Sequence, residues 1–526
     1  MLTFQTLLAL FVALYLVAML TVGVWSSRKV KNEYDYLTAS QSIGPWVGGA
    51  SLAATQMSAG TYIGLIGTHY LFGNAWIWCW PGIWFGYLIT VLLVAPRMRA
   101  FAQRSGGMTV PDFISARYNS TWVRGIAAIL IAVTYTLMMG AQFQGGGVML
   151  ETLLGVPAMV GIIVMLVVTV AYATLGGMRA TAYTDFIQQI IMTTGIVVGI
   201  PLLISMAGGW PYLVSVWDNI VQSPNTTPQY TGWHWQVNPM FVIGGSVAFL
   251  FTFAAAPYEM TRYYSMKDNK TVRWAPVIAL LFQIPVCVGG AIMGMTMRTM
   301  FPNMISGDAT STIFASSVMP PLVGVLVVLA VLAAIMSTVA SIMIVTGSAL
   351  ARDVYGKIIN PNASEASKLK LNRIMVVLLG VAPIAIANMK LDIVQFVVIA
   401  QAAIFGSFFF VPVIIGMVWK RGTTAGAIAA MISGFVTVVG IYGANLANEP
   451  WVGHPVFWGA GASAVFYVAV SLVTKPVDEQ HLALFFRDIR NKLIKEGRYD
   501  PPQMSEHGRG VTAGRAEAMG KTEAAL

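Results

Sequence analysis

The stretch AATQMSAGTYIG, residues 53–64, places polar side chains in the middle of a segment that is otherwise apolar enough to span a bilayer. Hydrocarbon offers no water to satisfy polar groups, so such a stretch needs an explanation. Gly60 lowers helix propensity, and Ser58 and Thr61 compete for backbone hydrogen bonds. Close helix packing explains small residues, but it does not explain the bulky Gln56. We therefore predict a helix that unwinds in mid-membrane and exposes carbonyl oxygens able to coordinate a cation.

Hydroxyl groups gather in a second apolar segment, AAIMSTVASIM at 333–343. Ser337, Thr338 and Ser341 lie within about one helical turn and can share a face. Such hydroxyls can bond the carbonyls of their own helix, or they can join carbonyl oxygens around a hard cation. The segment alone leaves both interpretations open.

A carboxylate follows the glycine pair of the segment TLGGMRATAYTDFIQQ, residues 174–189. Gly176 and Gly177 are predicted to end one helix, which places Asp185 near the start of the next. There a carboxylate favours the helix dipole, and this is the more common role of such a residue. A part in cation release is the sharper alternative.

These residues need a membrane protein to position them. The chain has 526 residues, of which 57% are hydrophobic and only 10% are charged, whereas soluble proteins carry about 25% charged residues. Apolar runs long enough to span a bilayer recur along the chain. We predict an all-α membrane protein with about thirteen transmembrane helices, at residues 4–25, 45–67, 75–95, 125–148, 157–175, 185–206, 239–259, 275–297, 320–349, 373–389, 393–418, 424–445 and 453–474.

Basic residues indicate the orientation. With the N-terminus outside, every Lys and Arg except Arg298 and Lys390 falls in a loop or tail on the inner side, Arg262 included. This agrees with the positive-inside rule and predicts a multi-pass protein of the cell inner (plasma) membrane with a cytoplasmic C-terminus. The net charge of +10 then comes from loops that face anionic lipid, and not from a nucleic-acid surface.

The sequence holds no pattern of catalytic residues. Its five histidines are scattered, and no glycine loop precedes a Lys and a Ser or Thr as in phosphate-binding motifs. We therefore expect neither an enzyme nor an ATP-driven pump. Residues 1–475 form the predicted transmembrane domain, and 476–526 a cytoplasmic tail with an amphipathic helix at 480–496 and disorder from Tyr499 onward.

Five motifs, in order along the chain, resemble those of the sodium:solute symporter family, closest to its pantothenate, proline and monocarboxylate permeases. They are TVPDFISARY at 109–118, YATLGGMRA at 172–180 with TDFIQ at 184–188, PYEMTRYYSMKDNK at 257–270, AAIMSTVAS at 333–341 and GMVWKRGTTAGAIAAMISG at 416–434. The resemblance covers nearly all of residues 1–475. It implies a LeuT-type core of two inverted five-helix repeats, roughly 45–418, in which the second and seventh spans are broken.

The same resemblance implies a site for Na⁺ made of uncharged oxygen atoms. Its ligands would be the carbonyls of Ala54, Met57 and Ala334 and the hydroxyls of Ser337 and Thr338. Some members carry a second sodium site, for which Asp185 and Ser341 match here. Ala340 replaces a hydroxyl of that site, a departure that weighs against a second bound ion. Glu259 stands where the family resemblance suggests a neutral polar residue.

The central cavity implied by this architecture would hold a small-molecule substrate. Its predicted lining is Gln56, Thr61, Tyr62, Gln142, Gln144, Tyr258 and Gln401. No Lys or Arg lies near a predicted midplane, so a substrate carboxylate would meet amides, hydroxyls and the ends of broken helices. The segment AQFQGGGVMLETLLGVP at 141–157 resembles pantothenate permeases. We therefore predict sodium-coupled import of a small carboxylate-bearing nutrient, with pantothenate as the leading example.

Alternatives remain inside and outside this class of transporter. Proline, a short monocarboxylate or a sugar could take the place of pantothenate. A membrane sensor or an uncoupled channel on the same fold is an alternative of a different kind, although the tail lacks the pattern of a globular signalling domain. The sequence gives no indication of the oligomeric state.

Overall fold

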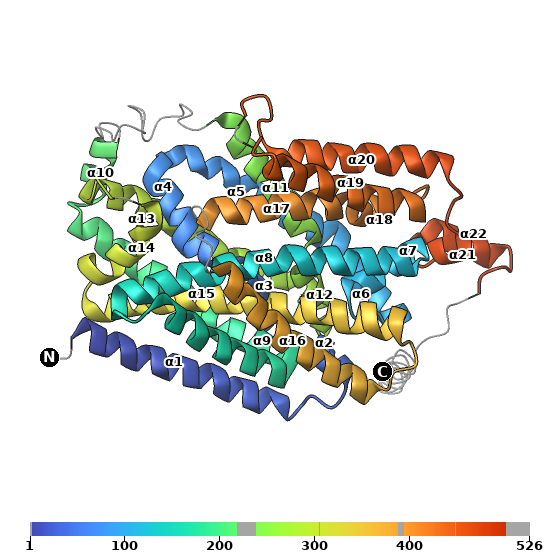
Figure 1. The fold of residues 1–526 in the computed structure, drawn as a ribbon, viewed down its shortest axis with the longest axis horizontal. Helices are drawn as coiled ribbons and strands as arrows, with labels where there is room; N and C mark the ends of the chain where they lie inside the picture. Colours follow the sequence, from blue (N-terminus) through green and yellow to red (C-terminus); the bar gives the residue numbers. More distant parts are fainter. Residues whose placement is uncertain (1–2, 218–237, 305, 388–393, 448, 501–526) are drawn as a thin grey trace, which may run out of the picture.

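The computed structural model of the chain describes residues 3–217, 238–304, 306–387, 394–447 and 449–500. Within these ranges the backbone is helical apart from loops and one isolated bridge between Ile43 and Met266. The long helices lie side by side in one bundle and run along its long axis (Figure 1). The predicted all-α class is confirmed.

The elements have the following bounds. The α-helices are α1 (Phe4–Ser27), α2 (Glu33–Thr38), α3 (Pro45–Gln56), α4 (Ile66–Phe72), α5 (Trp80–Ile89), α6 (Ala95–Ser105), α7 (Val110–Tyr118), α8 (Thr121–Leu154), α9 (Ala158–Met206), α10 (Trp210–Trp217), α11 (Pro239–Ala255), α12 (Pro257–Ser265), α13 (Asn269–Met300), α14 (Thr310–Ile313), α15 (Pro321–Ser348), α16 (Glu365–Ala387), α17 (Val394–Phe410), α18 (Gly416–Val418), α19 (Thr424–Gly443), α20 (Pro455–Val473), α21 (Glu479–Leu482) and α22 (Arg487–Lys495). Short 3-10 and π segments join some of them: η1 (Ala39–Gln41), η2 (Gly60–Leu65), η3 (Gly73–Cys79), η4 (Thr90–Val94), η5 (Gly307–Ala309), η6 (Phe314–Val318), η7 (Ala349–Ile359) and η8 (Val411–Ile415).

Ten helical stretches among the described residues are long and apolar enough to cross a membrane, whereas the sequence predicts thirteen. Two causes account for the difference. α9 covers two predicted spans but counts as one stretch, and the predicted spans that contain α3 and α16 are not represented by these helices among the ten. Gly177, with φ 55° and ψ −144°, bends α9 at the point where a helix end is predicted. The number of spans therefore depends on whether a helix with such a bend is counted as one span or as two.

Two helices are broken within the bundle. α3 ends at Gln56, and Met57 (φ −78°, ψ 113°) leaves the helical conformation before η2 begins. α11 ends at Ala255, after which Ala256 (φ −62°, ψ 123°) is extended and Pro257 begins α12. Proline suits that first position because it has no N–H to leave unsatisfied. Both breaks fall in the spans that are predicted to be broken.

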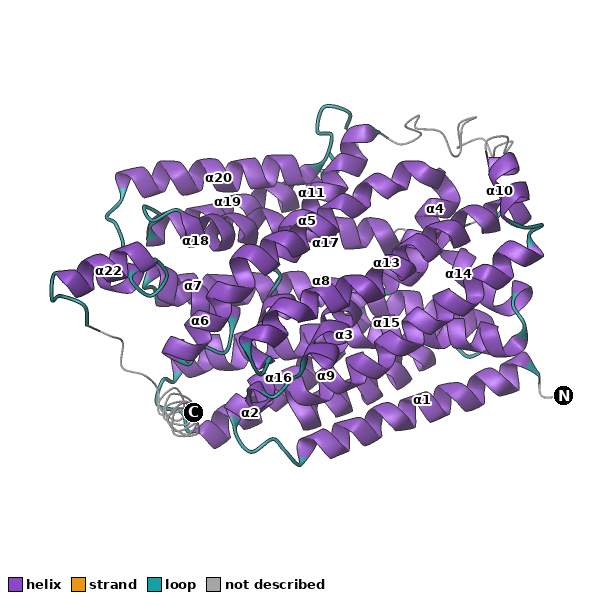
Figure 2. Cartoon of the chain, turned by 180° about the vertical axis from the view of Figure 1, so that it is seen from behind, coloured by secondary structure: helices purple, strands orange, loops and turns teal. Residues whose placement is uncertain are grey.

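α15 lies at the centre of the bundle. It packs on α8 and α9 and also contacts α1, α3 and α12, and every side chain from Val327 to Ser348 is buried. α1 and α20 form opposite edges of the bundle (Figure 2). A helix without an exposed face can satisfy its hydroxyl groups only with protein atoms or bound ligands.

A buried ion network joins several elements at one end of the bundle. Arg352 pairs with Glu33, and its Nε lies 3.3 Å from Asp112 Oδ2. Arg124 also pairs with Asp112, and its Nη1 lies 2.9 Å from Asp353 Oδ1. Burial opposes ionisation of Asp112, but the two guanidinium groups outweigh it and hold the pKa of this carboxyl below its usual range. The network ties α2, α7, α8 and η7 together.

The C-terminal segment packs on the transmembrane domain. The prediction of one amphipathic helix at 480–496 is wrong, because the chain forms two short helices, α21 and α22, with a turn between them. Phe485 in that turn stacks on Phe101 of α6 and meets Phe113 of α7 edge to face. The partly buried ring of Phe485 thus packs on the bundle at the point where the helix is interrupted. The disorder predicted from Tyr499 onward falls outside the described residues except at residues 499 and 500, and so does most of the segment 207–238 between two predicted spans.

Candidate functional site

Five oxygen atoms from α3, its break and α15 meet near the middle of the bundle. Ser337 Oγ lies 2.8 Å from the carbonyl oxygen of Ala54 and 3.1 Å from that of Ala334. Thr338 Oγ1 lies 3.1 Å from the carbonyl oxygens of Met57 and Ala334. We call these atoms the five-oxygen cluster; they are the atoms that the family resemblance assigns to sodium. All five residues are buried.

The hydroxyls of the cluster serve two helices at once. Each has one proton and lies within hydrogen-bond distance of the Ala334 carbonyl of its own helix and of a carbonyl of α3 or its break, with the Thr55 carbonyl also 3.0 Å from Thr338 Oγ1. Of the two interpretations left open by the sequence, bonding to the carbonyls of the own helix occurs here, at Ala334. Coordination of a cation stays a prediction. A hydroxyl can rotate its proton away and offer a lone pair instead, so the same atoms can surround a cation. Oxygen ligands are those that a hard cation prefers.

Side chains satisfy the backbone N–H groups that the break in α3 leaves free. Gln142 Oε1 of α8 accepts from the N–H of Ala59 at 2.7 Å. Ser58 Oγ accepts from the N–H of Gly60 at 3.1 Å, and Thr61 Oγ1 accepts from the N–H of Ser58 at 3.3 Å. Since buried backbone groups are costly without partners, these contacts keep the unwound segment in one conformation.

Asp185 lies inside α9, and its predicted position at a helix start is wrong. Its Oδ2 is 2.8 Å from Arg262 Nη2 and accepts from Ser51 Oγ at 2.6 Å. Arg262 Nη2 also bonds Ser341 Oγ. The prediction of Arg262 in a loop is wrong too, because this residue lies in the helix α12 and is buried. The two residues matched to a second sodium site are thus in contact with the same guanidinium group.

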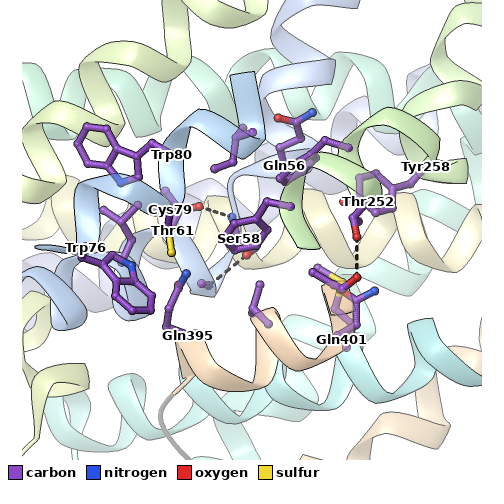
Figure 3. A pocket seen from close by; sticks show the side chains of 18 residues that line it. Gln56, Ser58, Thr61, Trp76, Cys79, Trp80, Thr252, Tyr258, Gln395 and Gln401 are labelled. Carbon is purple, nitrogen blue, oxygen red and sulfur yellow. Dashed lines mark hydrogen bonds between the residues drawn. The ribbon is translucent and has the colours of Figure 1, made fainter. Parts of the chain in front are cut away.

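A small cavity of about 50 Å³ adjoins the break in α3. Its polar lining consists of Gln56, Ser58, Thr61, Thr252, Tyr258, Gln395 and Gln401, and its aromatic lining includes Trp76, Trp80, Phe249 and Phe253. Figure 3 shows the two tryptophans at one end and Tyr258 at the other. None of the described residues that line it is charged. The cavity therefore suits a compact molecule without net charge.

The predicted substrate residues divide between this cavity and other positions. Gln56, Thr61, Tyr258 and Gln401 line it. Tyr62 and Gln142 do not: the Tyr62 carbonyl accepts from Ser311 Oγ, and Gln142 supports the break. Gln144 lines a separate cavity between α8, α14 and the start of α17. Neighbouring helical residues point about 100° apart, which explains why Thr61 and Tyr62 differ.

Sequence reasoning missed the aromatic end of the cavity. Trp76 and Trp80 come from the segment AWIWCW at 75–80, and Cys79 lies beside them in the lining. The signal was the spacing of the two tryptophans, four residues apart, which places them on one helical face. Tryptophans near a predicted span end are, however, more often membrane-interface residues, so the pattern alone does not indicate a binding site.

The cavity offers more hydrogen-bond donors than acceptors. Among the described residues, no partner is found for Gln56 Nε2, Trp76 Nε1, Trp80 Nε1 or Gln401 Nε2. Among the same described residues, Gln395 Oε1 is the one hydrogen-bond acceptor of the lining that has no partner. Buried polar groups are normally satisfied, so a bound molecule that accepts hydrogen bonds fits this arrangement. A carboxylate is such a group.

Glu259 follows the cavity residue Tyr258 and is buried. It lies in the first turn of α12, where the positive end of the helix dipole favours a carboxylate. This position explains how an acidic residue is tolerated at a place where the family resemblance suggests a neutral one. Its Oε1 has no hydrogen-bond partner among the described residues.

Known transporters are similar to this chain in sequence and in fold. The family model described as sodium:solute symporter family matches residues 36–434. The osmoregulated proline transporter OpuE of Bacillus subtilis (strain 168) is 27% identical over 495 residues, which cover 92% of this chain and 97% of the relative. The sodium/proline symporter of Staphylococcus aureus (strain JH9) is 28% identical over 444 residues, which cover 81% and 84%.

A solved structure matches the fold over most of its length. It is a substrate-bound, outward-open Na⁺-coupled sialic acid symporter, with a TM-score of 0.74, 18% sequence identity and coverage of 90% of this chain and 99% of that chain. At this identity the match shows the fold alone, which is the LeuT-type architecture with its broken helices.

Proposed function

Because the chain belongs to the sodium:solute symporter family, we propose that it is a sodium-coupled symporter that imports a small zwitterionic amino acid, with proline as the first candidate. The family is one of transporters, and together with the apolar helices it indicates a multi-pass plasma-membrane protein. The relatives named above are proline transporters. They favour the proline alternative, and the pantothenate prediction is left without support.

One observation supports coupling between cation and substrate. Gln56 and Ser58 line the cavity, and Met57 between them supplies a carbonyl to the five-oxygen cluster. A cation that fixes the Met57 carbonyl therefore also fixes two residues of the cavity wall. Binding at either site then lowers the free-energy cost of ordering the other, which is a coupling free energy shared by both ligands.

The chemistry of the lining supports a zwitterion. The unpartnered amide and indole N–H groups can donate to a carboxylate, and the rings of Phe249 and Phe253 can pack on a hydrocarbon ring. The carbonyl end of α3 is the negative end of that helix dipole and favours the ammonium group. A molecule with no net charge also loses less solvation energy on entry than an anion does.

We further propose an N-terminus outside and a cytoplasmic C-terminus, as the basic residues predict. The C-terminal helix α22 carries Lys492 and Lys495 in its last turn, which suits a segment near anionic lipid. An epitope tag added after Leu526 should react with antibody only in permeabilised cells, and a tag before Met1 in intact cells. The reverse result would contradict this orientation.

Uptake into proteoliposomes of the purified full chain tests the proposed function. We expect radiolabelled proline to accumulate under an inward Na⁺ gradient, and not when K⁺ replaces Na⁺. Pantothenate, pyruvate, acetate, glucose and sialic acid serve as competitors in the same assay. Stronger competition by any of these than by proline would contradict the substrate, and equal uptake in K⁺ would contradict sodium coupling. A sodium current without substrate would indicate an uncoupled channel.

A further inference from the structure

A guanidinium group lies where the family resemblance matched a second sodium ion. Arg262 Nη2 contacts both matched residues, Asp185 through Oδ2 at 2.8 Å and Ser341 through Oγ. Its Nε donates to Ser51 Oγ at 2.8 Å and to the Ser51 carbonyl at 3.2 Å, and its Nη1 donates to the carbonyl of Tyr258. The arginine thus joins α12 to α3, α9 and α15.

The Asp185 carboxylate and the Arg262 guanidinium balance each other's charge, and the buried Glu259, three residues before Arg262 in α12, forms no ion pair with that guanidinium. Asp185 is fully buried, and Arg262, Ser51 and Ser341 are at most 2% exposed. A buried carboxylate needs a compensating positive charge, and the guanidinium supplies it at contact distance. A sodium ion bound at the same carboxylate would place a second positive charge next to the first in a buried environment, where like charges repel strongly.

The side-chain oxygen atoms Asp185 Oδ2 and Ser341 Oγ of this site already have hydrogen-bond partners. Asp185 Oδ2 accepts from Arg262 and from Ser51, while Ser341 Oγ accepts from Arg262 and donates to the Ser337 carbonyl at 2.8 Å. Ala340 contributes no side-chain oxygen. Among the described residues Asp185 Oδ1 has no hydrogen-bond partner, but one oxygen atom is not a coordination shell for a hard cation.

We infer that Arg262 serves as a built-in cation at the Asp185–Ser341 position, so that the protein binds one sodium ion, in the five-oxygen cluster, and not two. The inference goes beyond the proposed function because it concerns the number of ions and holds whatever the substrate is. A tethered cation is not released into solution. Each transport cycle would therefore draw on the gradient of one sodium ion.

Counting bound sodium ions tests the inference. Equilibrium binding of ²²Na⁺ to the purified full chain in detergent, at saturating concentration, gives the number of ions per molecule. We expect one ion for the wild type and two for Arg262→Ala, because removal of the guanidinium frees Asp185 Oδ2 and Ser341 Oγ. The double variant Arg262→Ala with Asp185→Asn should return to one ion, since it lacks the carboxylate.

Two further variants sharpen the result. Arg262→Lys keeps a positive charge and should bind one ion. Arg117→Ala is a matched control, because Arg117 is also buried but donates to the carbonyls of Gly416 and Trp419 at 2.7 and 2.8 Å; it should bind one ion as well. A gain of an ion in either variant would show that the gain in Arg262→Ala is not specific to the lost guanidinium and would overturn the inference.

The readout is the difference between variants, so it is separate from the proposed function. A wild type that binds no sodium contradicts both sodium coupling and the single ion inferred for the five-oxygen cluster, whereas the role of Arg262 as a built-in cation still requires one more ion in Arg262→Ala than in the wild type. Two ions in the wild type, or no gain in Arg262→Ala, overturn it. If Arg262→Ala does not fold, Asp185→Asn in the wild-type chain decides: an unchanged number of ions supports the inference, and loss of one ion overturns it.

Discussion

The side-chain oxygen of Gln142 accepts a hydrogen bond from the backbone N–H of Ala59 at 2.7 Å. This contact joins α8 to the break in α3. Ala59 follows Met57 by two residues, and the Met57 carbonyl lies 3.1 Å from Thr338 Oγ1. Gln142 therefore acts on the five-oxygen cluster by holding the unwound backbone in place, although it contributes no atom to the cluster.

Gln142→Ala should lower the apparent affinities for sodium and for substrate together. The variant leaves the buried Ala59 N–H without a partner, a loss of about 1–3 kcal/mol. The sequence alone predicts an effect on substrate binding only, so the two expectations differ. Uptake measured against Na⁺ concentration separates them. Gln142→Glu keeps an acceptor oxygen and should be milder, and a normal sodium curve for Gln142→Ala would refute the positioning role.

Ser337→Ala and Thr338→Ala should each weaken sodium binding strongly. Each removes one of five oxygens, and loss of a contact to a charged group costs roughly 1.5–3 kcal/mol, which is about a tenfold to hundredfold change in affinity. High Na⁺ should restore part of the substrate uptake because the two sites are coupled. Ser348→Ala is the control, since among the described residues Ser348 Oγ bonds only the Val345 carbonyl of its own helix. Unshifted sodium curves in both cluster variants would exclude this site.

Gln401→Ala should raise the KM for substrate and leave the number of bound sodium ions unchanged. Gln401 lines the cavity, and its Nε2 has no partner among the described residues. Its loss therefore costs a contact to substrate, worth roughly 1.5–3 kcal/mol if the acceptor is a carboxylate. Gln144→Ala provides the comparison because Gln144 lines a different cavity. An equal rise in KM for both variants would place the substrate elsewhere.

Arg352→Ala should destabilise the folded protein by about 3–5 kcal/mol, because it leaves the fully buried Glu33 without its cation. Thermal unfolding in detergent measures the effect. Arg498→Ala removes an exposed pair with Glu496 and should change stability by less than about 1 kcal/mol. Similar unfolding temperatures for the two variants would mean that the ion network contributes little.

Local sequence patterns predict the parts of this molecule that depend on neighbours along the chain. Polar and glycine residues around Met57 mark the first break, because backbone hydrogen bonding is a local property. The second break, before Pro257, was implied by the family resemblance alone. The hydroxyls of Ser337 and Thr338 could be placed within one turn of the same helix from their spacing alone. Family resemblance then associated them with the carbonyls of α3, and the structure brings these atoms within hydrogen-bond distance.

Contacts between distant segments escape such reasoning. Arg262 was assigned to a loop because basic residues usually flank spans, but its partner Asp185 is 77 positions away, and no local pattern shows that the two meet. Gln142 was assigned to the substrate for its predicted depth, whereas its direction depends on the rotation of α8. The interruption of the predicted amphipathic helix at Phe485 is a further example, because the ring of Phe485 contacts Phe101 of α6 and Phe113 of α7, which lie far away in the sequence.

Cys79 and Cys287 are the two cysteines of the chain, and both are buried with free thiols. Of the two, Cys79 is part of the cavity wall. A water-soluble alkylating reagent can reach it only while the cavity is open to the aqueous phase. In a Cys287→Ser background the rate of Cys79 alkylation therefore reports the open fraction of molecules. The natural sequence thus already contains a probe for following how sodium and substrate shift that population, with no label introduced into the cavity.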